Sequence, residues 1–222
     1  MVHNYFALHG LGEKHLVIHA DNCAGQNKNN AVIMYLAWRV ACGLHTQITY
    51  SFMVAGHTKF SPDGFFGLLK LKLRKSEVDN LNDLVKVVED STPGGFNKSQ
   101  TIFDENGNRI VHFYNWVEFL SKHFKTIPNI LKYHHFTLHK NSIGKVEVQK
   151  TIDGDKQIIN IMKSKDIINI TGFPQEIFPA ELSAERKWYL YEQVRPHIGD
   201  PQKRDEYCSL PNVPKPKYSK NN

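Results

Sequence analysis

Residues 15–54 constrain the fold most, because strand, helix and strand signals follow one another there. An apolar run with β-branched residues opens this region and ends at Asp21, which is typical of a buried strand that presents a carboxylate at its carboxyl end. The polar segment 24–30 predicts a turn, and the mostly apolar segment 31–41 predicts a helix. Residues 46–54 alternate in polarity and predict a second strand. This order predicts an α/β fold with a mainly buried sheet.

Helices are expected in the next part of the chain. Ser61 is a favourable N-cap, and it precedes a proline and an aspartate, so a helix is expected over residues 61–74. Apolar residues at helical spacing predict a further helix over residues 77–90. A loop rich in glycine, proline and asparagine follows over residues 92–100, and a short helix is expected near residues 116–124.

The remainder predicts a small antiparallel β meander and a terminal helix. The meander is expected as a sub-domain of its own, with strands over residues 131–139, 144–152 and 156–163. A helix around residues 183–194 precedes a tail rich in proline and lysine, for which we expect disorder. We therefore expect three segments: a partial core over residues 1–91, a helix with the meander over residues 92–182, and the terminal helix with its basic tail over residues 183–222.

The charge balance favours a polyanionic partner. Lysine and arginine (28) exceed aspartate and glutamate (22) by six, and the pI is ≈ 9.1. Because the charges are scattered, the alternative is a solvated helix face and a soluble tail. Three widely separated cysteines lack the spacing of a disulfide framework or a zinc site, so we expect a reducing compartment, the cytosol or nucleus. The sequence has no apolar run of roughly 18 residues, so no membrane span is expected.

Two carboxylates are candidate metal ligands. Asp21 ends the first strand, where α/β sheets place their ligand sites, and Asp63 opens the helix after the second strand. Two-metal phosphoryl transfer requires carboxylates from separate elements that converge on hard divalent cations. Two structural alternatives remain open: Asp63 acts only as a first-turn acid of its helix, and Asp21 belongs only to a turn.

Several polar residues around these acids are candidate contacts for nucleic acid. The candidates are Asn22, Gln26, Asn27, Lys28 and Lys59. Amides and a lysine at a helix N-terminus suit phosphate or base contacts, although they also suit a simple helix cap and turn. His57 is a possible auxiliary proton carrier or metal ligand, and a structural histidine at a strand end is the alternative.

Two sequence runs, at residues 19–29 and 56–67, resemble an uncharacterised transposase-associated domain. Segments at residues 116–119, 133–136 and 186–191 are similar to downstream features of that family. More remotely, the order of strand, Asp-Asn, turn and helix resembles the ribonuclease-H-like core of retroviral integrases and DDE/D transposases. This resemblance implies that Asp21 and Asp63 are the second and third acids of a Mg²⁺ or Mn²⁺ site that acts on DNA in the nucleus. An oligomeric assembly is also implied by this resemblance alone.

The chain departs from that pattern before Asp21. Only twenty residues precede this acid, and they contain Glu13 but no strand long enough to open such a core. The resemblance therefore implies a partial ribonuclease-H-like core, truncated at the N-terminus and followed by a helical segment and the meander. It also implies that this chain is inactive or incomplete as a nuclease or strand-transfer enzyme.

Three functions remain open from the sequence. The first is a transposase-derived, metal-dependent DNA nuclease or strand-transfer protein. The second is a non-catalytic nucleic-acid-binding protein that contacts phosphates through the basic helix at residues 68–75 and the meander. The third is a hydrolase that holds a transition metal with His19, Asp21, His57 and Asp63.

Overall fold

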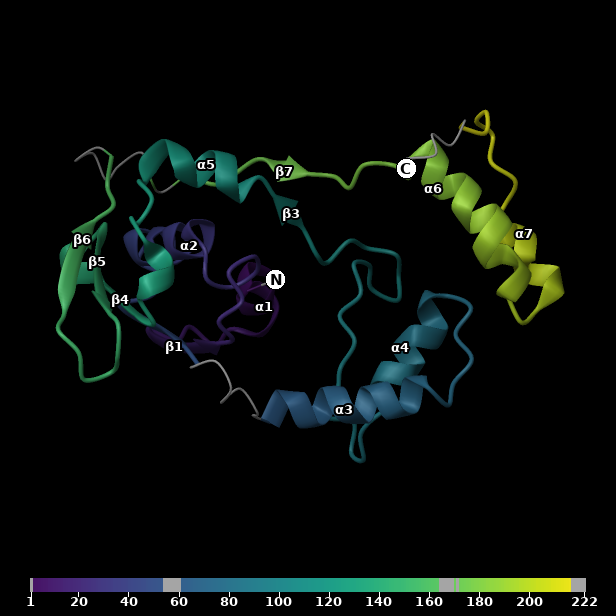
Figure 1. Ribbon diagram of the computed structural model, residues 1–222, viewed down its shortest axis with the longest axis horizontal. Helices are drawn as coiled ribbons and strands as arrows, with labels where there is room; N and C mark the ends of the chain where they lie inside the picture. Colours follow the sequence, from purple (N-terminus) through teal and green to yellow (C-terminus); the bar gives the residue numbers. More distant parts are fainter. Residues whose placement is uncertain (1, 54–60, 164–169, 171, 217–222) are drawn as a thin grey trace. The chain divides into compact units, whose positions relative to one another are not determined.

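The computed structural model describes residues 2–53, 61–163, 170 and 172–216 of the 222-residue chain (Figure 1). The chain divides into two compact units. The first, the sheet unit, combines the residues up to 58 with residues 102–177. The second, the helical unit, combines residues 59–101 with residues 178–222. Each unit is therefore built from two separate stretches of chain, unlike the three consecutive segments expected from the sequence.

A mixed five-stranded sheet forms the sheet unit. Its order is β1 (His15–Ala20), β2 (Gln47–Phe52), β4 (His135–His139), β5 (Lys145–Gln149) and β6 (Gln157–Asn160). The first two strands are parallel and joined by helix α2 (Asn30–Ala41), whereas the other pairs are antiparallel. The predicted α/β class is therefore confirmed. The meander is not a separate sub-domain, because β4 pairs directly with β2, where Tyr50 lies opposite Phe136.

The core of the sheet unit lies between the sheet and two helices. Alternate residues of β2, β4 and β5 point into it, and α2 is buried along most of its length because it is apolar on nearly every side. Helix α5 (Trp116–His123) contacts α2 and contributes the fully buried Leu120. Burying one such side chain stabilises the fold by roughly 1.5–3 kcal/mol.

The other face of the sheet is polar and partly exposed. Two rows of cross-strand neighbours run across it: His19, Ser51, His135 and Gln149, and His15, Gln47 and His139. Val17 and Ile158 are apolar exceptions, on the two outer strands, and are 64% and 70% exposed. This alternation of polar and apolar positions is typical of a sheet with one face directed to solvent.

Two further elements of the sheet unit lie outside those expected from the sequence. Helix α1 (Val2–His9) begins the described chain, and β3 (Phe113–Tyr114) pairs with β7 (Glu176–Ile177) in a two-stranded sheet. The ring of His3 lies 5.2–6.1 Å from five aromatic rings, those of Tyr35, Trp38, Tyr114, Trp116 and Phe173. This aromatic cluster joins α1 to α2 and to the segment around β3.

The helical unit contains α3 (Ser61–Leu73), α4 (Leu81–Glu89), α6 (Ala184–Tyr189) and α7 (Arg204–Tyr207). Helix α4 begins later than residue 77, because Asn80 and Asp83 form a reciprocal capping box at its N-terminus. Helix α6 continues into a π-helical turn over Leu190–Val194.

The expected disorder after residue 194 is wrong for the part of the tail that the structure describes. Short helical turns occupy Arg195–His197 and Pro201–Lys203 ahead of α7. The indole N–H of Trp188 donates to the carbonyl of Val213 at 3.0 Å, and Arg195 forms an ion pair with Asp205. The first contact ties the segment to α6 and the second joins two of its own turns, which composition alone did not indicate. Within the described ranges, none of the helices has the length and apolar character needed to cross a bilayer.

Candidate functional site at the carboxyl end of β1

Asp21 directly follows β1 and is exposed, as the sequence predicts for an acid at a strand end. Its Oδ1 accepts hydrogen bonds from the backbone N–H of Cys23 at 3.2 Å and from the side-chain amide of Asn27 at 2.5 Å. The first bond is an Asx turn, which fixes the direction of the carboxylate. Its Oδ2 accepts no hydrogen bond from the part of the chain that the structure describes. The acid is therefore held by one oxygen and presents the other.

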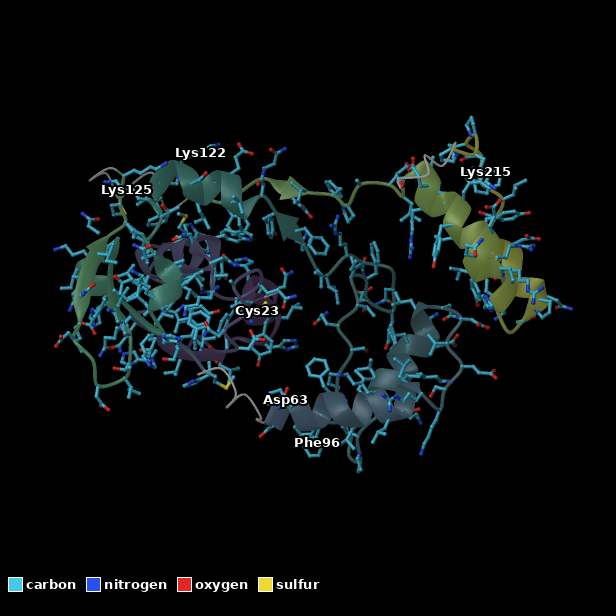
Figure 2. All side chains as sticks on the ribbon, in the orientation of Figure 1. Cys23, Asp63, Phe96, Lys122, Lys125 and Lys215 are labelled. Carbon is cyan, nitrogen blue, oxygen red and sulfur yellow. The ribbon has the colours of Figure 1, made fainter. Side chains whose placement is uncertain are left out.

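The loop after Asp21 includes Cys23, which is labelled in Figure 2, and is built around the backbone carbonyl of this residue. This oxygen accepts from the backbone N–H groups of Gln26, Asn27 and Lys28 at 3.3, 2.9 and 3.0 Å. Asn29 caps α2 by accepting from the backbone N–H of Val32 at 3.0 Å. The capping role left open in the sequence is thus correct for Asn29, while Gln26 is exposed.

Lys28 faces inward rather than outward. It is 2% exposed, its Nζ donates to the carbonyl of Leu131 at 3.0 Å, and it lies 5.3 Å from the centre of the Phe52 ring. Burial lowers the pKa of this ammonium. The structure therefore places this predicted nucleic-acid contact inside the protein, where it fastens the loop to the chain near residue 131.

Tyr50 supports the same loop from β2. Its hydroxyl donates to the carbonyl of Asn27 at 3.1 Å. Burial and the nearby negative charge of Asp21 raise the pKa of Tyr50 to about 12, so the phenol stays protonated and keeps donating at neutral pH. Asn27 is thereby fixed at its backbone by Tyr50 and at its side chain by Asp21.

Two histidines lie beside this loop, although the sequence assigned them no role: His134 directly precedes β4, and His135 is its first residue. The amide of Asn22 lies 3.4 Å from Nε2 of His134, whose Nδ1 lies 3.1 Å from the carbonyl of Lys150. Since Nδ1 must donate to that carbonyl, Nε2 accepts from Asn22. His135 Nδ1 lies 3.0 Å from the Ser51 hydroxyl. Burial lowers the pKa of both histidines, which favours neutral imidazoles. Only strand pairing brings these residues together, so no local sequence pattern could have indicated them.

The second predicted acid lies in the other unit. Figure 2 labels Asp63, an exposed residue in the first turn of α3 in the helical unit, whereas Asp21 belongs to the sheet unit. The position of Asp63 agrees with its predicted place at a helix start. His57 and Lys59 lie outside the described residues. Among the residues that the structure does describe, no group of three or more His, Cys, Asp or Glu side chains could hold a metal ion.

Comparison with known proteins identifies the family of the chain. No curated protein matches it, and no solved structure matches it. A family described as a domain of unknown function (DUF7869) matches residues 7–153. The match includes β1, α2, β2, β4 and β5, and therefore the whole loop between Asp21 and Asn29. Because it spans more than half of the 222 residues, the chain belongs to the DUF7869 family.

Proposed function

We propose that this protein is transposase-derived and acts on DNA through a divalent-metal site that includes Asp21. The observation that carries the proposal is the carboxylate itself, which is exposed, oriented by two hydrogen bonds and free at one oxygen. It lies at the carboxyl end of a parallel strand pair, where α/β proteins bind ligands.

The donor chemistry around Asp21 fits a hard cation. Carboxylate and amide oxygens are ligands that Mg²⁺ and Mn²⁺ accept, and Mg²⁺ is commonly held by one or two carboxylates with water and substrate phosphates. A protein cluster of three ligands is therefore not required. A cation bound there would stabilise charge on phosphate and lower the pKa of an attacking water. The sequence resemblance also implies a metal-binding role for Asp63.

The same proposal includes a ribonuclease-H-like ancestry for the sheet unit. Its support is the order of strand, Asp21-Asn22, turn and helix, followed by a parallel strand. In that ancestry Asp21 and Asp63 are the second and third acids, and a first acid is not assigned in this chain. We therefore expect only weak cleavage by the chain alone.

Nicking of supercoiled DNA tests the catalytic part of the proposal. In the presence of Mn²⁺, we expect slow nicking that is lost in both Asp21→Asn and Asp63→Asn. Asparagine at position 21 can still accept from the loop, so a loss would report the missing charge. Asp153→Asn, which removes an exposed acid from the β5–β6 hairpin, is the matched control and should nick at the wild-type rate. Nicking that survives Asp21→Asn would contradict the catalytic assignment.

A second candidate, non-catalytic binding of nucleic acid, is favoured by the polar face of the sheet. A groove of ≈ 320 Å³ on this face is lined by Gln47, Thr137, His139, Lys145 and Lys156, among others. Glu147, which also lines the groove, forms an ion pair with Lys156 at 2.7 Å. Lys145 forms no ion pair within the described ranges, so its charge is available to a phosphate.

Salt dependence separates the two candidates. Binding through the sheet face alone should weaken steeply as salt rises and should not depend on Mg²⁺. Lys145→Met should reduce that dependence, whereas Asp21→Asn should leave it unchanged. Affinity that is equal at low and moderate salt would contradict the second candidate.

A further inference from the structure

The sheet unit contains a buried arginine that has no carboxylate partner. Arg39 of α2 is 5% exposed, its Nε donates to Nδ1 of His45 at 3.2 Å, and its Nη1 donates to the hydroxyl of Tyr35 at 2.8 Å. The ring of Phe6 covers the guanidinium at 4.7 Å. Within the described ranges, Arg39 forms no ion pair, and its Nη2 has no hydrogen-bond acceptor. Buried charges are normally paired, so this positive charge lacks its usual compensation.

His45 adds a second group without a partner. It is 2% exposed, and its Nδ1 accepts the hydrogen bond from Arg39, so the ring proton is on Nε2. This Nε2 is buried and has no hydrogen-bond partner among the described residues. Burial and the positive charge of Arg39 lower the pKa of His45 to about 4, so the ring is neutral at neutral pH. His45 therefore presents a buried N–H donor that lacks an acceptor.

A cavity adjoins both groups. It has a volume of ≈ 230 Å³ and is lined by Arg39, His45, Phe6 and residues of the loop that includes Glu13 and Lys14. Glu13 does not fill the role of counter-ion, because its carboxylate accepts from the backbone N–H of Leu11 at 3.0 Å and forms no ion pair with Arg39. Since each molecule in liquid water occupies about 30 Å³, the cavity has room for a small organic anion.

We propose that this cavity binds a small, singly charged carboxylate, which supplies an acceptor oxygen to Nη2 of Arg39 beside the buried ring of His45. The planar fork of a guanidinium matches the two oxygens of a carboxylate. The negative charge of Glu13 at the rim repels the doubly charged form of inorganic phosphate, which is present at neutral pH, more than it repels a singly charged carboxylate. The site does not depend on the proposed metal site, because it uses none of the same residues.

Calorimetric or NMR titration of the full chain with sodium acetate tests the proposal, with sodium chloride at the same ionic strength as the reference and inorganic phosphate as a second probe. We expect saturable acetate binding, accompanied by shifts of the Arg39 Nε–H and His45 Nε2–H signals. Phosphate should bind at least several-fold more weakly. No saturable binding of acetate, or tighter binding of phosphate, would overturn the proposal.

Two exposed rim residues provide variants that should not disturb the fold. Glu13→Gln removes the repelling charge and should tighten acetate binding about threefold, whereas Lys14→Met should weaken it by a similar factor. Arg39→Met should abolish binding, and the two rim variants keep the test informative if that variant does not fold. Acetate binding that is unchanged in both rim variants would place the anion elsewhere and overturn the site.

Discussion

Two buried cations of the sheet unit, Lys28 and Arg39, are held without a carboxylate. Lys28 is stabilised by one backbone carbonyl and a nearby aromatic ring, and Arg39 by a histidine, a tyrosine hydroxyl and two aromatic rings. Cation–π contacts and neutral acceptors offset only part of the cost of removing a charge from water. These residues are therefore where the energetics of single side chains can be tested most directly.

Lys28→Met tests whether this lysine is structural. We expect the free energy of unfolding to change by less than about 1 kcal/mol or to rise, because the loss of one hydrogen bond is offset by burying an apolar side chain instead of a charge. DNA affinity should stay the same, whereas the exposed control Lys145→Met should lower affinity and leave stability unchanged. Chemical denaturation and a binding titration measure the two effects. A large loss of affinity in Lys28→Met alone would show that the lysine contacts the nucleic acid.

His45 predicts a specific dependence of stability on pH. Its pKa is about 4 in the folded chain, whereas an unperturbed histidine has a pKa of 6.5, so the unfolded state binds the proton first as the pH falls. Arg39, Glu13 and Lys14 are the charged groups that act on it. The free energy of unfolding therefore contains the full contribution of neutral His45 above pH 6.5. This contribution is lost as the pH falls from 6.5 towards 4. The loss is on the order of 2 kcal/mol, after a reduction for solvent screening.

The comparison of wild type with His45→Asn isolates this effect from the other histidines. Asparagine can still accept from Arg39 but does not titrate in this range. Denaturant unfolding at pH 7.5 and pH 4.5 should show that the stability advantage of the wild type shrinks on acidification. Parallel pH profiles for the two proteins would contradict a depressed pKa at His45.

At the scale of elements, the local signals were sufficient for most of the sheet unit. The motif of β1, α2 and β2 was predicted because the hydrophobic periodicity of each strand and helix can be recognised in neighbouring residues. The pairing of β2 with β4 was not predicted, because it joins residues 48 and 138, which no local pattern connects. The start of α4 was placed too early, since the capping box between Asn80 and Asp83 overrides the apolar spacing before it.

The candidate site was predicted only in part for the same reason. The place of Asp21 follows from the end of a strand, whereas the contact of Asn22 with His134 depends on tertiary structure. The inward direction of Lys28 could not be inferred from a polar segment. One feature of the sequence points to the proposed anion cavity: Arg39 stands within an otherwise apolar helix that is buried along most of its length.

The N-terminal cap of α2 fixes the end of the loop that follows Asp21, so its contribution to stability can be tested directly. Asn29→Ala removes the acceptor for the N–H of Val32 and should lower the free energy of unfolding by about 1 kcal/mol. Asn29→Asp keeps an acceptor and adds a negative charge at the helix N-terminus, so it should retain most of the stability. Thermal and denaturant unfolding measure both variants. Equal destabilisation by the two substitutions would assign the effect to the hydrogen bond that the Asn29 amide donates to the carbonyl of Gln26 at 3.1 Å, and not to the cap.

At the scale of the whole molecule, the chain crosses between its two units more than once. The sheet unit and the helical unit each combine two distant stretches, and the two predicted acids belong to different units. The metal proposal is therefore tested most directly at Asp21 within the sheet unit. The cation itself is the probe, because a paramagnetic ion broadens the NMR signals of the amides nearest to it.

The decisive measurement is an NMR titration of the full chain with Mn²⁺, in the wild type and in Asp21→Asn. We predict early, selective broadening of the Cys23 and Asn27 amide signals, and loss of both effects in Asp21→Asn. Asp153→Asn should broaden like the wild type. Broadening at Cys23 that persists in Asp21→Asn, or no selective broadening in the wild type, would contradict a metal site at the end of β1.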